Sequence, residues 1–511
     1  MSDWSDGYVT NIDYNFGYYL ELNPQNIPLA FLDAGLAAPE NVTACELGFG
    51  QGVSVNIHAA ASDTRWFGTD FNSAQAGFAR ALAAVSGAGA QLVDQPFAEF
   101  CNRPDLPDFD YIGLHGIWSW ISDQNRAVII DFIRRKLAVG GVLYVGYNTQ
   151  PGLAAMVPMR ELLSGHAEVM GAPGHDILTR IDAALAFAER LLATNPLYAR
   201  ANPHVAARLT RIKKESREYL AHEYFGRHWL PMPFSRMAEW LAPARLSYAC
   251  SARFLDHIDA LNLSGEQQAL LAEIPDVVFR ETVRDFVVNQ NFRRDYWVRG
   301  ARRLNALEQA EARRAVQVLL AQPRADVPLK VAGSAFEATM HEGVYGAILD
   351  TLADHQPRTL GQIEQAVMHR GIPFAQLFQA VLTLTGTGSL VTVQDQAKIA
   401  RARTQTDKLN AFLCDRARGS NEISVLASPV SGGGVMLNRL KQLFLLARKQ
   451  GKERPAEWAE FVWQVLAPQG HKLIKDGKTL ESTGENIAEL AAQAQAFNDQ
   501  HLPMLKALRI A

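Results

Sequence analysis

The chain has 511 residues, 48% of them hydrophobic, and a formal net charge of −3 at pH 7. This length suits about three domains, and the near-neutral charge gives no overall basic bias toward nucleic acid or an anionic membrane. The four cysteines form no C-x-x-C pair, so neither a zinc site nor a disulfide framework is expected. No secretory signal is visible, and the longest uncharged stretch, Leu137–Met159, is interrupted by Gly, Pro, Asn and Gln. We therefore expect a cytoplasmic protein with no metal, no membrane span and no nucleic-acid partner.

The segment Tyr8–Tyr19 is the first distinctive part of the chain. It contains four tyrosines and one phenylalanine within a short distance. Its position just before the core predicts a lid that folds over a ligand cleft.

From Pro39 to Asn148, strand patterns alternate with helix patterns. Strands are expected at Val42–Leu47, Arg65–Asp70, Ala90–Asp94, Phe109–Leu114 and Val142–Tyr147. Helices are expected at Val53–Ala61, Ala74–Val85, Pro96–Cys101 and Asn125–Leu137. Gly140–Gly141 is expected to end the last helix. The alternation predicts an α/β fold with a parallel, doubly wound sheet.

Residues 42–52, VTACELGFGQG, predict a buried strand, a glycine-rich turn and the start of a helix. Gly48, Gly50 and Gly52 lack a Cβ atom, so the backbone can approach a ligand closely. Asp70 follows the next strand about twenty residues later, where an acid can reach ribose hydroxyls. This pattern suits either a nicotinamide cofactor or S-adenosylmethionine (SAM).

Glu46 distinguishes between these two cofactors. The pyrophosphate of a dinucleotide needs a helix N-terminus free of nearby negative charge. Glu46 lies two residues before the first glycine of the turn, where it would repel phosphate and attract the sulfonium and ammonium groups of SAM. We therefore expect SAM as the cofactor. The alternative is a tight turn in an unrelated α/β protein.

Further candidate contacts to the cofactor follow the third strand, because ligands of such sheets bind beyond the carboxyl ends of the strands. Asp94 and Gln95 could hydrogen-bond the adenine amino group, with Phe97 against the adenine ring. The alternative role for Asp94, capping of the helix that follows, is compatible with the first.

The fourth and fifth strands lead into residues that lie where a methyl group would be transferred. His115 is a candidate base or orienting group, since imidazole titrates near neutrality. The alternative is a histidine that caps the strand end. Aromatic residues could form a channel that holds an ammonium group by cation–π attraction, although rings at this density are more often plain core. The candidates are Tyr14, Tyr18, Tyr19, Trp118, Trp120 and Tyr147.

After Asn148 the alternation ends and the chain is expected to be mainly helical. Helices are predicted at Pro151–Glu168, Asp176–Thr194 and His204–Glu223. The arginines at positions 293, 294, 299, 302 and 303 could form an anion-binding surface. The alternative without a binding function, a solvated or intramolecularly paired set of side chains, is favoured.

The order of elements in Glu342–Val393 resembles a winged-helix domain. Helices are expected at Tyr345–Ala353, Leu360–Met368 and Pro373–Thr383, followed by a strand at Leu390–Val393. No Lys or Arg occurs between positions 371 and 397. Since DNA-binding winged helices neutralise phosphates with such residues, we expect a packing or protein-recognition module.

Eight segments along most of the chain are informative when they are taken together. They are YNFGYYLELNP, CELGFGQG, FGTDFN, LHGIWSWIS, VLYVGYNTQPG, HEYF, RDFVVNQNFRRDYWVRG and LASPVSGGGVMLNRLKQLFLLA. In these segments the chain resembles bacterial class I SAM-dependent methyltransferases that carry a methyltransferase regulatory domain. The best understood members are rickettsial-type protein lysine methyltransferases with a Rossmann-like core and helical dimerisation, middle and C-terminal domains.

The resemblance also implies roles for individual residues. On the substrate side it implies His115, Gly116, Trp118 and Tyr147, and His115 also borders the cofactor. The cofactor positions that it implies, together with those from the glycine turn, are Glu46, Gly48, Gly50, Gly52, Asp70, Asn72, Asp94, Gln95 and Phe97. The segment Asp94–Phe97 matches least closely because a proline is inserted there.

The resulting expectation is a SAM-dependent enzyme of three parts. Residues 1–150 would form the Rossmann-like core with its lid, residues 151–330 a helical middle region that could support a homodimer, and residues 331–511 a winged-helix-like domain. The expected reaction is methyl transfer to lysine side chains of a protein. The alternatives are an O- or N-methyltransferase for a glycan or small metabolite, and a non-catalytic scaffold that retains the fold.

Overall fold

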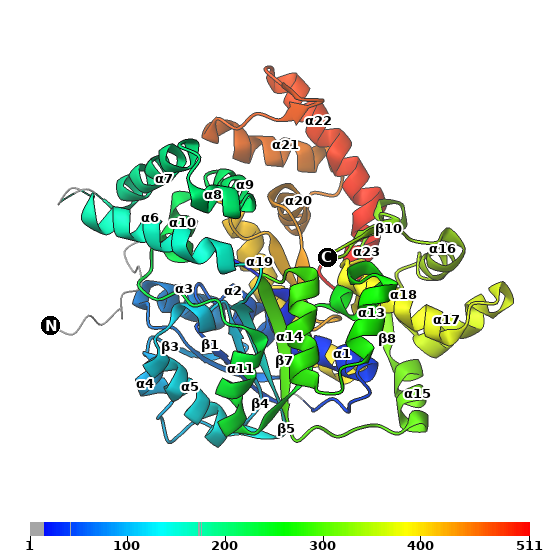
Figure 1. Ribbon diagram of the computed structural model, residues 1–511. Helices are drawn as coiled ribbons and strands as arrows, with labels where there is room; N and C mark the ends of the chain where they lie inside the picture. Colours follow the sequence, from blue (N-terminus) through cyan, green and yellow to red (C-terminus); the bar gives the residue numbers. More distant parts are fainter. Residues whose placement is uncertain (1–14, 41, 172–173, 175) are drawn as a thin grey trace.

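The computed structural model describes residues 15–40, 42–171, 174 and 176–511. At its centre the described residues form a seven-stranded sheet with the order β3-β2-β1-β4-β5-β7-β6 (Figure 1). Strands β1 to β5 are parallel, whereas β7 pairs antiparallel with both β5 and β6. The strands are β1 (Thr43–Leu47), β2 (Arg65–Thr69), β3 (Gln91–Val93), β4 (Phe109–His115), β5 (Leu137–Asn148), β6 (Leu246–Ser251) and β7 (Phe292–Arg299).

The five strands predicted from the first part of the sequence are confirmed, but the prediction at Gly140–Gly141 is wrong. Helix α5 (Asp123–Lys136) ends earlier, and both glycines lie inside the long strand β5. A Cβ atom on Gly141 would lie 2.9 Å from the carbonyl oxygen of Ala138 and 3.1 Å from that of Asp110. The glycine is therefore required by the close approach of the neighbouring backbone, and not by the end of a helix.

Helices cover both faces of the sheet, as a doubly wound fold requires. Successive residues of β1 face different cores, Ala44 toward one and Cys45 toward the other. On the Ala44 face lie α1 (Ile27–Asp33), α2 (Val53–Ala61) and α3 (Ser73–Ser86). On the Cys45 face lie α4 (Phe97–Phe100), α5 and α11 (Phe234–Leu241).

The sheet is not confined to the first 150 residues. Strands β6 and β7 come from the predicted middle region and extend the sheet beyond β5. Between them the chain forms α12 (Asp259–Asn262), α13 (Gly265–Ala272) and α14 (Val277–Val288). Sequence patterns did not predict these two strands, because β7 mixes apolar residues with Arg and Asp that are buried only through pairing.

A helical layer with its own apolar core precedes β6. It consists of α6 (Val157–Val169), α7 (Ile177–Ala193), α8 (Leu197–Ala201), α9 (His204–Ile212) and α10 (Arg217–Tyr224). The single helix expected over His204–Glu223 is therefore wrong, since it is divided into α9 and α10. Ser216 causes the division, because its side chain accepts a hydrogen bond from the N–H of Tyr219 and caps a new helix.

The predicted order of three helices and a strand in residues 342–393 is present. The elements from residue 306 to residue 392 are α15 (Ala306–Ala315), β8 (Gln317–Leu320), β9 (Lys330–Ala332), β10 (Glu337–Thr339), α16 (Glu342–Thr351), β11 (Arg358–Thr359), α17 (Leu360–Val367), α18 (Phe374–Gly386) and β12 (Leu390–Thr392). Strands β11, β8 and β12 form a small antiparallel sheet beside these helices.

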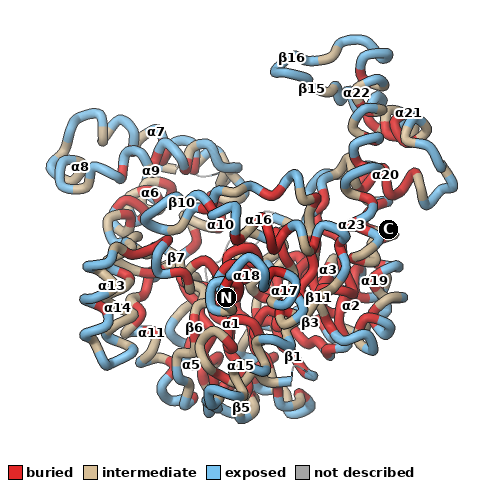
Figure 2. Tube along the Cα trace, turned by 90° about the vertical axis from the view of Figure 1, so that its right-hand side faces the viewer, coloured by how far each residue is buried: buried red, intermediate tan, exposed pale blue. Residues whose placement is uncertain are grey.

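The remaining C-terminal part packs back on the core. Helix α19 (Gln396–Arg416) lies against α2 and α3, and the side-chain amide of Gln394 donates to the carbonyl of Ala61 at 2.8 Å. The other elements are β13 (Val425–Ser428), β14 (Gly433–Met436), α20 (Arg439–Lys449), α21 (Pro455–Leu466), β15 (Ile474–Lys475), β16 (Lys478–Thr479), α22 (Thr483–Ala496) and α23 (Leu502–Ala507). Figure 2 shows that buried residues concentrate around the central sheet, while α7 to α9 project at the upper left of the view and α21 and α22 at its upper right.

Among the described residues, no helix combines the length and the apolar character that crossing a bilayer requires. All four cysteines are buried and free. The described part of the chain also contains no cluster of His, Cys, Asp and Glu that could hold a metal ion.

Candidate active site

A cavity lies at the carboxyl ends of the parallel strands. The glycine turn after β1, residues 95–97 after β3 and residues 115–117 after β4 line it. The segment around Tyr19, Asp70 and Phe71 after β2, and helix α10 contribute further walls. The cavity therefore occupies the edge of the sheet where ligands of doubly wound folds bind.

The three glycines of the turn serve different purposes, although each has a positive φ of 74°, 57° or 69°. Gly48 and Gly50 line the cavity. A Cβ atom on Gly48 would come within 2.4 Å of Cδ1 of Ile117. Gly52 lies at the N-cap of α2, where a Cβ atom would come within 2.4 Å of Cβ of Ala79. Gly52 thus permits helix packing and is not part of the cavity lining.

The Asp70 side chain stabilises the glycine turn by accepting hydrogen bonds, and it also lines the cavity. The N–H of Gly50 donates to its Oδ2 at 2.8 Å, and the N–H of Asn72 donates to its Oδ1 at 3.0 Å. Burial raises the pKa of Asp70 to about 6, against the lowering effect of these two hydrogen bonds. The carboxylate still has lone pairs available for a ligand hydroxyl.

Glu46 lines the same cavity as Asp70, and one of its carboxylate oxygens is unsatisfied. Its side chain is 3% exposed, lines the cavity, and has no hydrogen-bond partner for Oε2 among the described residues. Burial, and then the charge of Asp70, raise the pKa of Glu46 to about 8. A buried carboxylate without a partner is costly, so the site favours a ligand that brings positive charge.

Only some of the residues predicted to contact adenine line the cavity. Gln95 and Phe97 line the cavity, and Oε1 of Gln95 is buried without a hydrogen-bond partner in the described structure. Asp94 is exposed and lies outside the lining. Asn72 also lies outside it, because its side chain accepts hydrogen bonds from the N–H groups of Ala74 and Gln75 and caps α3.

His115 lies at the end of β4 and is held on two sides. Its Nδ1 is 2.7 Å from the hydroxyl of Tyr144, and the Tyr19 ring stacks on the imidazole with centroids 4.0 Å apart. Burial, and then the charge of Arg294, lower the pKa of His115 to about 3. The imidazole is therefore neutral near pH 7, which suits an orienting group better than a base for an ammonium ion.

Two of the candidate aromatic residues are core residues and not cavity residues. The Nε1–H of Trp118 donates to the sulfur of Met232 at 3.5 Å, and the Tyr147 hydroxyl donates to Oδ2 of Asp295 at 3.0 Å. Both rings are buried outside the cavity lining, because Tyr147 on β5 and Trp118 in the turn after β4 point into the apolar core beneath the sheet. Tyr19 lines the cavity, whereas Tyr14 lies outside the described residues.

A second cavity adjoins the first. Trp120 and Tyr19 line both, and Trp229, Phe292 and Glu223 line the second. Sequence reasoning did not assign site roles to Glu223, Trp229 or Phe292, which are far from the glycine turn in the chain. The segment HEYF, noted only for its resemblance to the family, was the available signal for Glu223.

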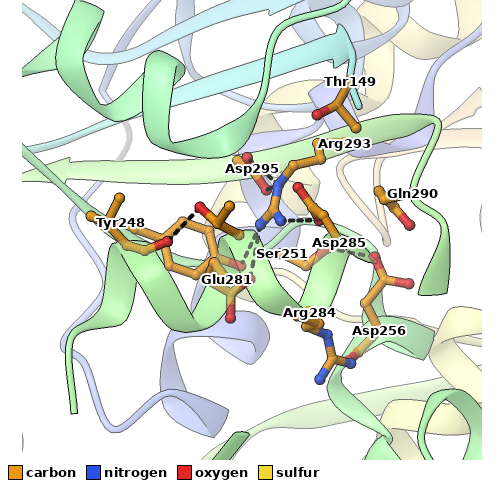
Figure 3. Close-up of polar contacts among 12 residues, drawn as sticks. Thr149, Tyr248, Ser251, Asp256, Glu281, Arg284, Asp285, Gln290, Arg293 and Asp295 are labelled. Atoms are coloured by element: carbon orange, nitrogen blue, oxygen red, sulfur yellow. Dashed lines mark hydrogen bonds and ion pairs between the residues drawn. The ribbon is translucent and has the colours of Figure 1, made fainter. Parts of the chain in front are cut away.

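Two of the five arginines considered for an anion-binding surface, Arg293 and Arg294, are internally paired instead. Figure 3 shows the buried guanidinium of Arg293 among acidic side chains, at 2.6 Å from Asp285, 2.8 Å from Asp295 and 2.9 Å from Glu281. Arg294 forms an ion pair with Glu21 at 3.0 Å. These contacts confirm for both residues the interpretation of intramolecular pairing.

Comparison with known proteins is consistent with this geometry. Residues 216–299, which include α10, β6 and β7, match the model of the predicted methyltransferase regulatory domain. The structure of PKMT2 from Rickettsia typhi in complex with AdoHcy resembles this chain with a TM-score of 0.70 and 16% identity, covering 97% of this chain and 99% of that chain. The structure of PKMT2 described without AdoHcy gives a TM-score of 0.68 at 18% identity over the same shares.

A sequence relative matches along the full length. The uncharacterized protein sll1526 of Synechocystis is 39% identical over 512 residues, which cover 99% of this chain and 99% of that protein. The chain therefore belongs to the family of sll1526; its residues 216–299 match the methyltransferase regulatory domain, and it shares the fold of PKMT2.

Proposed function

We propose that this chain is a SAM-dependent methyltransferase that transfers methyl groups to lysine side chains of a protein. The observation that carries the proposal is Glu46, a buried and unsatisfied carboxylate beside Asp70 in a cavity at the carboxyl edge of the sheet. A ligand with a sulfonium and an ammonium group supplies the positive charge that this pair lacks. A pyrophosphate would meet two carboxylates at the same place.

Each wall of the cavity suits one part of SAM. Asp70 would bind the ribose hydroxyls, Gln95 and Phe97 the adenine, and Glu46 the positively charged methionine end. When bound there, SAM supplies an electrophilic methyl group on a good leaving group. The protein then has to hold an acceptor in line with that methyl group, and alignment of this kind supplies several kcal/mol of the barrier.

The resemblance to bacterial protein lysine methyltransferases supports a lysine acceptor, as does the second cavity with its aromatic lining. In this proposal residues 1–150 provide the cofactor site, residues 151–330 the regulatory region and the outer strands, and residues 331–511 a winged-helix-like domain that recognises protein.

Titration calorimetry with SAM and with NAD tests the cofactor. Asp70→Ala should weaken SAM binding by about tenfold or more, since charge-assisted hydrogen bonds contribute roughly 1.5–3 kcal/mol each. Asp94→Ala is the matched control, because Asp94 ends the neighbouring strand but is exposed and lies outside the lining. Equal SAM affinity in both variants, or binding of NAD alone, would contradict the proposal.

Methyl transfer from radiolabelled SAM into a fractionated lysate tests the acceptor. Label should enter the protein fraction and be recovered as methyllysine after acid hydrolysis. Label found only in small molecules or glycans would replace the lysine acceptor with one of those classes.

A further inference from the structure

The second cavity is a continuation of the first at the end where the methyl group would be presented. Six residues line both cavities, and they come from the N-terminal segment, the end of β4, the turn that follows it, and α10. These residues are Asn15, Tyr19, His115, Gly116, Trp120 and Glu223. A group that enters the second cavity thus reaches the boundary of the cofactor site without crossing the protein interior.

Aromatic rings surround the second cavity. The rings of Trp120 and Trp229 are 6.1 Å apart with an interplanar angle of 36°, and the Phe292 ring is 5.7 Å from His115. Tyr219 and Tyr224 of α10 complete the aromatic lining. Such rings attract an alkylammonium group through their π faces and pack against its methylene stem.

Glu223 is the acidic residue on this boundary, and nothing in the described structure neutralises it. Its carboxylate forms no hydrogen bond or ion pair with another described residue. Two arginines line the same cavity, but Arg294 is paired with Glu21 at 3.0 Å and Arg208 hydrogen-bonds the hydroxyl of Tyr224. Glu223 therefore has no ion-pair partner among the described residues, although the charged Arg208 lines the same cavity.

We propose that the second cavity binds the primary ammonium group of an acceptor lysine, and that Glu223 holds this group and accepts one of its protons. The proposal rests on the proposed function, because it assigns the acceptor end of that same site. It places the proton acceptor in the regulatory domain and not in the residues that bind the cofactor.

The proton transfer and the methyl transfer balance in sequence. The ammonium nitrogen gives one proton to an Oε atom of Glu223 and keeps the electron pair. This pair forms the new N–C bond, while the C–S bond of the methyl donor breaks and its electrons remain on sulfur. The products are a methylammonium group and AdoHcy, and the proton on Glu223 leaves to solvent through the cavity mouth.

Burial brings the pKa of Glu223 and the pKa of the acceptor ammonium group closer together. Burial raises the pKa of Glu223 to about 7, and an ammonium group that enters the same cavity loses hydration, which lowers its own pKa. The charged groups that line the cavity beside Glu223 are Arg208 and Arg294. The other titratable groups that line the two cavities are Tyr19, Glu46, Asp70, His115, Tyr219, His222 and Tyr224.

Binding of n-butylammonium to the full chain saturated with AdoHcy tests the proposal directly. Affinity should rise between pH 6 and pH 8, because only ionised Glu223 attracts the probe. Glu223→Gln should bind about tenfold more weakly or worse and should lose this pH dependence. Glu218→Gln is the matched control, since Glu218 lies on the same helix but is exposed and does not line either cavity.

Proton release and methyl transfer give a second, independent set of measurements. Calorimetry at pH 7 in two buffers should detect proton release on n-butylammonium binding by the wild type and none by Glu223→Gln. Methyl transfer into lysate protein should fall at pH 7 in this variant and recover toward pH 10, where the free amine needs no base.

The outcomes separate this proposal from the proposed function. SAM affinity unchanged in Glu223→Gln shows that the variant is folded and that the cofactor site is intact. If the wild type binds SAM but n-butylammonium binds equally to wild type and Glu223→Gln, or to neither, the role of Glu223 is wrong while the cofactor assignment stands. If the wild type does not bind SAM, the proposed function fails.

Discussion

The ring of Tyr19 stacks on the imidazole of His115 at a centroid distance of 4.0 Å, and the Tyr144 hydroxyl lies 2.7 Å from Nδ1 of the same imidazole. The N-terminal segment and the sheet thus fix one histidine at the boundary between the two cavities. Tyr19 is a described part of the segment Tyr8–Tyr19 predicted as a lid, of which residues 8–14 lie outside the described residues.

Replacement of His115 should separate turnover from cofactor affinity. We expect His115→Ala to lower methyl transfer by about tenfold or more through loss of alignment, and to change SAM affinity by about threefold or less. Because burial holds the pKa of His115 near 3, the wild-type rate should have no step near pH 6.5 that this variant removes. A fully active variant would assign His115 to structure alone. His369→Ala, at an exposed position, is the control.

Glu46 should make the stability of the free protein depend on pH. Its pKa is about 8 in the folded chain and 4.5 as an ordinary side chain, so the folded state binds more protons across this window. Stability should therefore fall as pH rises from about 4.5 to 8. We expect Glu46→Gln to raise Tm at pH 8 to 9, with the gain disappearing toward pH 5, while SAM affinity falls. A lower Tm at pH 9, measured without ligand, would contradict this.

The local patterns of the first 150 residues predicted that part of the fold well. Alternating apolar strands, Asn72 as a helix cap and the glycine turn are short-range signals, and β1 to β4 lie within a residue or two of their predicted bounds. Strand β7 was not predicted because Arg293 and Asp295 look like surface residues. They are buried only because they neutralise each other, at 2.8 Å, and this pairing is invisible in a linear pattern.

The same reasoning explains which site residues the sequence could predict. Glu46 and Asp70 belong to one motif on two neighbouring parallel strands, so the strand order predicted that they lie close together. Trp118 and Trp120 are two positions apart, yet only Trp120 reaches the cavity, because the turn after β4 sends Trp118 into the core. Glu223 approaches the sheet edge only through packing of the helical layer, and no sequence spacing reveals that contact.

Gly48 should tolerate no side chain unless Ile117 also changes. Gly48→Ala adds left-handed backbone strain of roughly 1–2 kcal/mol to the clash with Cδ1 of Ile117 at 2.4 Å. We expect a large loss of SAM affinity in this variant, measured by calorimetry, and partial recovery in Gly48→Ala/Ile117→Ala. Gly89→Ala is the control for strain alone, because Gly89 has a φ of 75°, lies outside both cavity linings, and a Cβ atom there meets nothing within 4 Å. No recovery in the double variant would show that the clash is not the cause.

The charge cluster around Arg293 should stabilise the sheet only as a complete unit. Arg293 is 5% exposed, and Asp285 and Asp295 are 2% and 1% exposed, so removal of the arginine leaves buried carboxylates without a counter-charge. We expect Arg293→Met to lower the free energy of unfolding by about 3–5 kcal/mol at pH 8. Burial already raises the pKa of Asp285 to about 7 with Arg293 present, and loss of the arginine raises it further.

The loss in Arg293→Met should therefore shrink as pH falls from 8 to 6, because protonation removes the unpaired charge. Urea unfolding at both pH values measures this, and Arg293→Met/Asp285→Asn should recover part of the stability at pH 8. Arg302→Met provides the control, since the Arg302 side chain is 64% exposed and its pair with Glu308 contributes little. A loss of equal size at pH 6 and pH 8 would mean that the variant is destabilised by lost packing, such as the contact with the Phe234 ring at 4.2 Å, and not by unpaired charge.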